Sequence, residues 1–108
     1  MNKTDRLQGH LELLILHVLA CDSMHGWAIA QRLQVVSRSV LQVGQGSIYP
    51  ALRRLEDQGW IAAEWGLSEA GKRARFYALT SSGRQQLQRE RALWREFVAA
   101  VGRVLELA

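Results

Sequence analysis

Apolar residues near the start of the chain recur at the spacing of one helical face. They stand at positions i, i+3, i+4, i+7 and i+8, which is the pattern of an amphipathic helix. Leu13 and Leu16 widen this face until much of the helix circumference is apolar. Such a helix belongs in the centre of a fold or at a contact between subunits. The residues that set the pattern are Leu11, Leu14, Ile15, Val18 and Leu19.

A second helix is expected directly after this one. Residues 22–26 carry helix-capping chemistry, and the inward positions that follow are Ile29, Leu33 and Val36. We expect this helix to fade near residues 37–39.

The third helix has the sharpest signals. Residues 44–46 loosen the chain with two glycines, Ser47 is a good N-cap, and Pro50 falls in the first turn, where its missing N–H costs nothing. Gly59 supplies the C-terminal stop. The inward face consists of Ile48, Ala51, Leu52 and Leu55, and the opposite face carries Tyr49, Arg53, Arg54 and Asp57.

After Gly59 the hydrophobic period changes from helical spacing to two. Ile61, Ala63 and Trp65 fall on one side of a predicted strand. Gly66 and Gly71 bracket a polar turn, and residues 73–78 alternate again, so an antiparallel hairpin is predicted. The basic residues at its tip and on its return strand are Lys72, Arg73 and Arg75.

The chain closes with one long predicted helix. Thr80 is a natural N-cap, and apolar residues recur every seven positions with others beside them. Three helices, a hairpin and a long helix predict a mainly α fold with a small β-hairpin, which is a winged helix-turn-helix with a C-terminal extension. We expect the extension to be a dimerisation helix, because its seam carries more apolar surface than one short domain can cover. The dimerisation residues on this seam are Leu87, Trp94, Phe97, Val98, Val101, Val104 and Leu105.

Length and composition fit one compact domain. The chain has 108 residues, of which 48% are hydrophobic, enough for one modest core. Within it we expect residues 1–79 to form a winged-helix unit and residues 80–108 to form the dimerisation helix. No apolar run is long enough to cross a bilayer or leads to a cleavage site, so we expect a cytoplasmic protein. The single cysteine, Cys21, is expected to pack as a small hydrophobe.

The distribution of charge favours a polyanionic partner. The formal net charge is +4, which alone decides little. The basic face of the third helix and the basic hairpin would each be ordinary solvated surface by itself, but together they suit phosphates and guanine edges. Phe76 and Tyr77 are expected to pack within the hairpin.

The sequence contains no motif that would indicate an enzyme. His10 and His17 are two helical turns apart and lack further metal ligands, and no phosphate loop, nucleophile elbow or paired-carboxylate signature is present. We therefore expect neither a metal nor a cofactor. His25 opens the second helix, where it either caps the helix or contacts phosphate.

Several segments resemble the PadR-like family of transcriptional regulators. The run GSIYPALRRLEDQGWI (residues 46–61) is similar to the family's recognition-helix signature. The segments MHG (residues 24–26) and RFYALT (residues 75–80), followed by Gly83 and Leu87, resemble other parts of the family pattern in the same order. The resemblance covers about residues 7–105. The tip at residues 68–71 contains Glu69 and is less basic than in many similar sequences.

This resemblance implies a winged helix whose last helix packs against the first helix of a partner subunit. The DNA-facing residues that it implies, together with those suggested by charge, are His25, Ser47, Tyr49, Pro50, Arg53, Arg54, Lys72, Arg73 and Arg75.

We expect a homodimeric repressor that binds double-stranded operator DNA with an inverted repeat. The alternative is a protein-interaction adapter that keeps the winged fold without reading DNA. A further hypothesis places a small aromatic effector between the subunits near Trp94.

Overall fold

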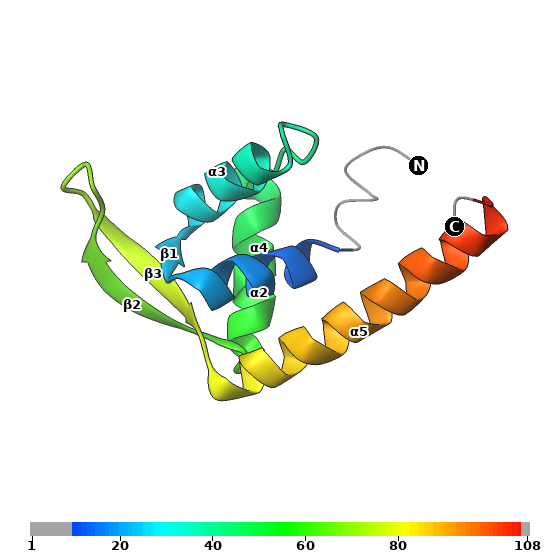
Figure 1. Cartoon of the computed structure of the whole chain (residues 1–108). Helices are drawn as coiled ribbons and strands as arrows, with labels where there is room; N and C mark the ends of the chain where they lie inside the picture. Colours follow the sequence, from blue (N-terminus) through cyan, green and yellow to red (C-terminus); the bar gives the residue numbers. More distant parts are fainter. Residues whose placement is uncertain (1–9, 107–108) are drawn as a thin grey trace.

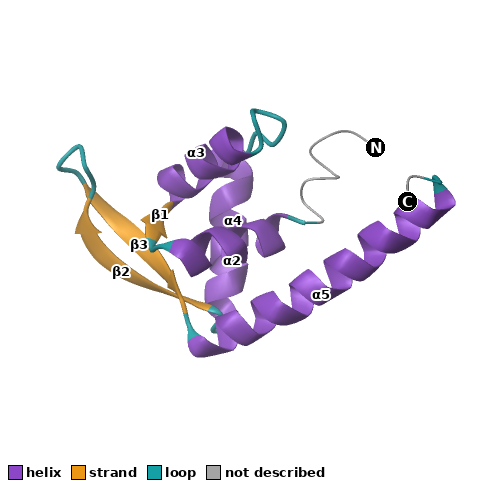
Figure 2. Cartoon of the chain, viewed as in Figure 1, coloured by secondary structure: helices purple, strands orange, loops and turns teal. Residues whose placement is uncertain are grey.

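The computed structural model describes residues 10–106. Four helices and a small antiparallel sheet make up the fold, and the strand order is β1-β3-β2 (Figures 1 and 2). The predicted order of three helices, a hairpin and a long helix is confirmed, and the short strand β1 was not predicted. The elements are α2 (Leu11–Cys21), β1 (Met24–His25), α3 (Gly26–Val36), α4 (Gln45–Asp57), β2 (Ile61–Leu67), β3 (Arg73–Leu79) and α5 (Ser81–Val104).

The core lies where α2, α3 and α4 meet the base of the sheet. The inward face of α4 is completely buried, and α2 contributes five buried residues, as its broad apolar face predicts. Two expected core residues are exposed instead. Val36, in the last turn of α3, is 70% exposed, and the Cys21 thiol is exposed at the end of α2. Both lie at helix ends, where the neighbouring chain turns away from the core.

Helix α4 starts earlier than its capping signals predict. Gly44 is the N-cap, and its carbonyl accepts from the backbone N–H groups of Ser47 and Ile48. Ser47 is therefore the third helical residue, and Pro50 lies in the second turn instead of the first. Since proline has no N–H, the Gly46 carbonyl forgoes its helical hydrogen bond.

The hairpin is longer than predicted. Gly66 belongs to β2 and pairs with Ala74, so the turn is confined to residues 68–72. A Cβ atom at Gly66 would lie 3.0 Å from the Phe76 ring, which packs across the strand there. Gly71 takes a positive φ of 75° in the turn, a conformation that suits glycine. The hairpin residues 61–79 are called the wing below.

Helix α5 begins in the core and then leaves it. Thr80 caps the helix as predicted, its side chain accepting from the Gly83 N–H at 3.0 Å. Gly83 and Leu87 are buried residues of the first two turns, and the remaining turns extend away from the body on the side opposite the wing (Figure 1). The molecule is accordingly elongated, with principal extents of 50 × 29 × 22 Å. None of the described helices is long and apolar enough to span a membrane.

The interior contact at Gly83 generates a stability prediction. A Cβ atom there would lie 1.9 Å from the Trp60 carbonyl oxygen, so Gly83→Ala must displace backbone and should lower the free energy of unfolding by roughly 2–4 kcal/mol. Gly102 is the matched control in the same helix, since nothing within 4 Å meets a Cβ there. Gly102→Ala should raise stability by about 0.5–1 kcal/mol in thermal or denaturant unfolding. Equal effects of the two substitutions would contradict the close approach of Gly83 to the Trp60 carbonyl oxygen.

Candidate nucleic-acid interface

The outer face of α4 is fixed by the burial of its inner face. Ile48, Ala51, Leu52 and Leu55 are all fully buried, so the residues between them must point to solvent. Tyr49, Pro50, Arg53 and Arg54 are exposed, and Ser47 is half-buried near the helix start. The predicted polar, basic and aromatic face is therefore one continuous surface of the folded chain.

The Tyr49 ring also joins α4 to α3. It lies over Gly26, where a Cβ atom would be 2.8 Å from Tyr49 Cε1. Gly26 is buried, whereas Tyr49 keeps 44% of its surface exposed. The ring can thus support the helix pair and still leave part of its surface open to a ligand.

His25 caps α3, and one of the two roles left open for it is confirmed. Its Nδ1 accepts from the Ala28 N–H at 3.2 Å, and its ring packs edge-on against Phe76, with centroids 5.3 Å apart. The residue also belongs to β1, which pairs with β3. A phosphate contact of His25 stays a prediction, and it would have to use Nε2.

Two of the candidate arginines already hold carboxylates. Arg54 Nε lies 2.7 Å from Glu12 Oε1, and an Arg75 terminal nitrogen lies 2.9 Å from Glu56 Oε2. The partners are partly exposed, so each pair contributes only about 0–1 kcal/mol. Neither carboxylate was predicted. For Glu12, the signal that could have drawn attention to it was an acidic residue within the largely apolar run of α2.

The remaining candidate cations have no ion pair with any residue between 10 and 106. These are Arg53 on α4, and Lys72 and Arg73 on the wing. Arg73 instead lies over the Trp65 ring, with its guanidinium carbon 4.7 Å from the ring centroid. The sequence prediction missed this use of Trp65.

Tyr77 shows how the base of the wing differs from its tip. Tyr77 is buried and Phe76 half-buried, so the expected packing roles of both are confirmed. Burial raises the pKa of the Tyr77 phenol above its ordinary value, and the neighbouring Arg75 opposes part of that rise. The phenol therefore stays neutral near physiological pH.

A separate apolar surface follows the outer part of α5. Its aliphatic and aromatic side chains recur along one face, and all are at least 38% exposed. Leu87, predicted to share this surface, is only 3% exposed and belongs to the core of its own chain. The prediction for Leu87 is wrong because α5 still touches the body at that turn. The exposed members are Leu93, Trp94, Phe97, Val98, Val101, Val104 and Leu105.

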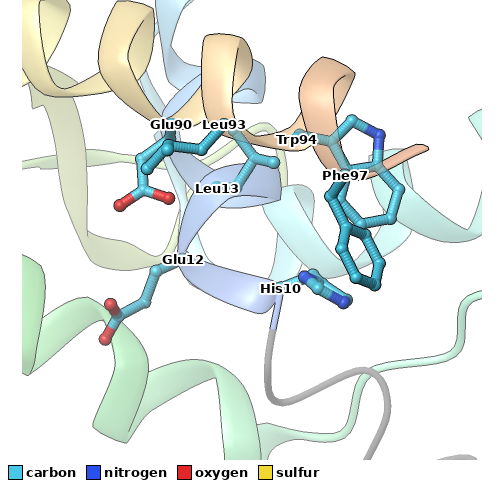
Figure 3. Close-up of a pocket in the computed structure, with 7 residues that line it drawn as sticks. All are labelled: His10, Glu12, Leu13, Glu90, Leu93, Trp94 and Phe97. Atoms are coloured by element: carbon cyan, nitrogen blue, oxygen red, sulfur yellow. The ribbon is translucent and has the colours of Figure 1, made fainter. Parts of the chain in front are cut away.

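A groove of about 300 Å³ lies where this surface meets the start of α2. His10 packs edge-on against Trp94, with ring centroids 4.7 Å apart, and Phe97 lies 5.9 Å from Trp94. Figure 3 shows these rings together at one end of the groove and the acidic side chains of Glu12 and Glu90 toward the other. The groove therefore combines aromatic surface with negative charge.

The histidines do not build a metal site. Within the described part of the chain no three His, Cys, Asp or Glu residues are arranged to hold a metal ion. His10 contacts Trp94, and His17 contacts the Arg91 side chain.

Comparison with known proteins identifies this arrangement. Residues 15–89 match the model of the transcriptional regulator PadR-like family. The chain belongs to the PadR-like family of transcriptional regulators. This PadR-like protein is 34% identical over 91 residues to Transcriptional regulator Rv3488 of Mycobacterium tuberculosis, covering 84% of this chain and 81% of the relative. Its expected class, a regulator and not an enzyme, is thereby confirmed.

Solved structures of regulators share the fold. A PadR-like transcriptional regulator from Bacillus cereus is 27% identical and matches with a TM-score of 0.81 over 94% of this chain and 96% of that chain. A transcriptional regulator from Clostridium thermocellum matches with a TM-score of 0.83 over 92% and 96% of the two chains, and at 22% identity it shows the fold alone. The predicted winged-helix class is confirmed by these likenesses.

Proposed function

We propose that this PadR-like regulator is a repressor that binds operator DNA as a homodimer. The observation that supports DNA binding best is the position of the exposed face of α4 beside a basic wing, with five cationic side chains on the two elements. A helix of this kind fits the major groove, while basic wing residues reach the neighbouring backbone or minor groove. Repression then follows from occlusion of a promoter.

Each candidate residue has a role in the proposed complex. Arg53 and Arg54 are the side chains of α4 that reach base edges or phosphates, and Tyr49 adds a hydroxyl donor. Ser47, Pro50 and His25 line the approach to the helix, and the wing residues Lys72, Arg73 and Arg75 supply charge. Residues 1–79 thus supply the DNA contacts and residues 80–108 the dimer contacts of one domain.

The homodimer is supported by the exposed apolar surface along the outer part of α5, which we call the seam. Trp94, Phe97, Val98 and Val101 follow each other at spacings of three, one and three, so they form one stripe along the helix. A contiguous apolar surface of this kind marks a protein interface. A two-fold dimer presents two recognition helices and therefore demands an inverted repeat in the DNA.

An aromatic effector is a second proposal, and the groove beside Trp94 supports it. The aromatic rings suit a flat ligand, and Glu90 favours one that carries positive charge, whereas the charge of Glu12 is already matched by Arg54. Its proposed effect is to lower the affinity for operator DNA. The same coupling must then make the ligand bind the free dimer more tightly than the DNA-bound one.

The DNA contacts can be tested with Arg53→Ala and Arg54→Ala. An operator is first selected by the parent protein from a random-sequence duplex library, and binding is measured against operator and random duplex over a range of salt concentrations. Each lost base contact should cost about 1–3 kcal/mol on the operator and relax specificity, because the partner base edge is left unpaired. Arg89→Ala, which removes one exposed charge from α5, should leave the affinity nearly unchanged.

The outcome also separates a DNA reader from an adapter. Binding by the parent should fall steeply as salt increases, since phosphate contacts release counterions. A parent without sequence selectivity or salt dependence would favour the adapter. If both arginine variants bind the operator as tightly as the parent, α4 is not the recognition helix.

The dimer can be tested by placing a charge on the seam of α5. Val98→Glu should convert the protein to a monomer at micromolar concentration and abolish operator binding, because the carboxylate would be buried without a partner. Ala99→Glu places the same charge on the opposite face of the helix, beside Glu96 and Arg103, and should remain dimeric. Sedimentation equilibrium distinguishes the two, and a monomeric parent that still binds operator contradicts the two-fold argument.

The effector proposal predicts a ligand response that depends on Trp94. Within a panel of planar cationic, neutral and phenolic compounds, at least one should quench tryptophan fluorescence and release operator DNA, and Trp94→Ala should lose both responses. Trp27→Ala is the control, since Trp27 is also exposed but lies on α3. Quenching without any change in DNA affinity would leave the groove without a regulatory role.

A further inference from the structure

Trp65 is the most exposed aromatic side chain of the wing. It lies in β2 with 60% of its surface exposed, although tryptophan usually buries its ring when a core is available. Trp65 faces Arg75 across the strand pair, and Leu67 faces Arg73. Because side chains alternate along a strand, Trp65, Arg73 and Arg75 share one face of the wing.

Both arginines lie against aromatic rings on this face. The Arg73 guanidinium carbon is 4.7 Å from the centre of the Trp65 ring, well within the distance of a cation–π contact. Arg75 lies 6.0 Å from the same ring and 5.8 Å from Tyr77. Arg75 is also held by Glu56 of α4 at 2.9 Å.

These contacts form a continuous row from the recognition helix toward the tip of the wing. Glu56 holds Arg75, Arg75 borders Trp65, and Trp65 holds Arg73. A free arginine loses much side-chain freedom when it binds a ligand, and a contact already present in the free protein reduces that loss.

We propose that Trp65 is a positioning residue of the wing, whose ring holds Arg73 in place for contact with the DNA backbone. This role rests on the proposed DNA-binding function. Trp65 acts through Arg73 and not through its own contact with DNA. Trp27 is exposed to a similar degree, at 56%, but has no arginine over its ring among the described residues, so it provides a matched control.

The first test needs no DNA. In the free protein, the ring current of Trp65 should shift the NMR signals of the Arg73 δ-methylene protons upfield. Trp65→Leu should abolish that shift and Trp65→Phe should retain part of it, whereas Trp27→Leu should leave it unchanged. Arg73 signals at their unperturbed positions in the parent protein would overturn the proposal, whatever the protein binds.

The second test is a double-mutant cycle in DNA affinity, measured with Trp65→Leu, Arg73→Ala and the double variant on the selected operator. For a dimer with two wings, Trp65→Leu should weaken binding roughly five- to twentyfold, as expected from the loss of two exposed cation–π contacts. In the Arg73→Ala background the same substitution should have little further effect. Trp65→Phe should recover part of the affinity because it keeps an aromatic face.

The failures of the two proposals are distinguishable in this cycle. An equal loss in both backgrounds would show that Trp65 touches DNA directly and would overturn the positioning role. Unchanged affinity of Trp65→Leu, with a parent that binds well, also overturns that role and leaves the proposed function intact. A parent that binds no duplex overturns the proposed function and the role of Trp65 with it.

Discussion

The close approach of α5 to the backbone at Trp60 fixes how the parts of this molecule are oriented. Gly83 leaves no space for a side chain against the Trp60 carbonyl, and Thr80 N–H donates to that same carbonyl at 3.1 Å. The hydroxyls of Thr80 and Ser82 both donate to the Gly59 carbonyl, at 2.7 and 3.0 Å. One junction thus joins the end of α4, the start of β2, the end of β3 and the start of α5. Because α5 carries the apolar seam and α4 the basic face, this junction determines their relative direction.

The consequences of that junction reach the proposed dimer. A helix of 24 residues that is buried only in its first two turns acts as a lever, since a small rotation at its base displaces its far end, and the contacts of Arg91 and Trp94 with α2 limit that rotation. In a two-fold assembly through the seam, the separation of the two recognition helices depends on this angle. In the proposed dimer, a rigid junction would therefore set the spacing of the two helices as well as contribute to the stability of each chain.

Much of the fold follows from the sequence because its strongest signals are local. The inward face of α4, the alternation of the wing and the Thr80 cap depend on near neighbours, and the structure has them as predicted. The burial of Leu87 and Val36 depends on where a helix leaves the body of the fold, and hydrophobic periodicity does not predict that point. Leu87 has the same spacing as Trp94, yet one is buried in its own chain and the other is exposed. Periodicity identifies an apolar face but not which part of it a partner must cover.

The sequence predicted which residues line the candidate interface, but not the contacts that its cations make. Which of them are held, and by what, depends on contacts between residues far apart in the chain. Arg54 meets Glu12 from α2, forty-two positions away, and Arg75 meets Glu56 from α4, nineteen positions away. The two-residue strand β1 was missed for the same reason, because Met24 and His25 are too short a run to predict a strand without knowledge of β3.

The two carboxylates also bear on how a chain of modest net charge could bind DNA in the proposed complex. They neutralise Arg54 and Arg75 in the free protein, which lowers the long-range field of the interface. The cost of exchanging them for phosphate is small, because exposed pairs contribute only about 0–1 kcal/mol. In return, each carboxylate restricts the rotamers of its arginine before any ligand arrives, and the Trp65 ring does the same for Arg73. Order in the side chains then adds to the effect of the charges on how well this surface fits a duplex.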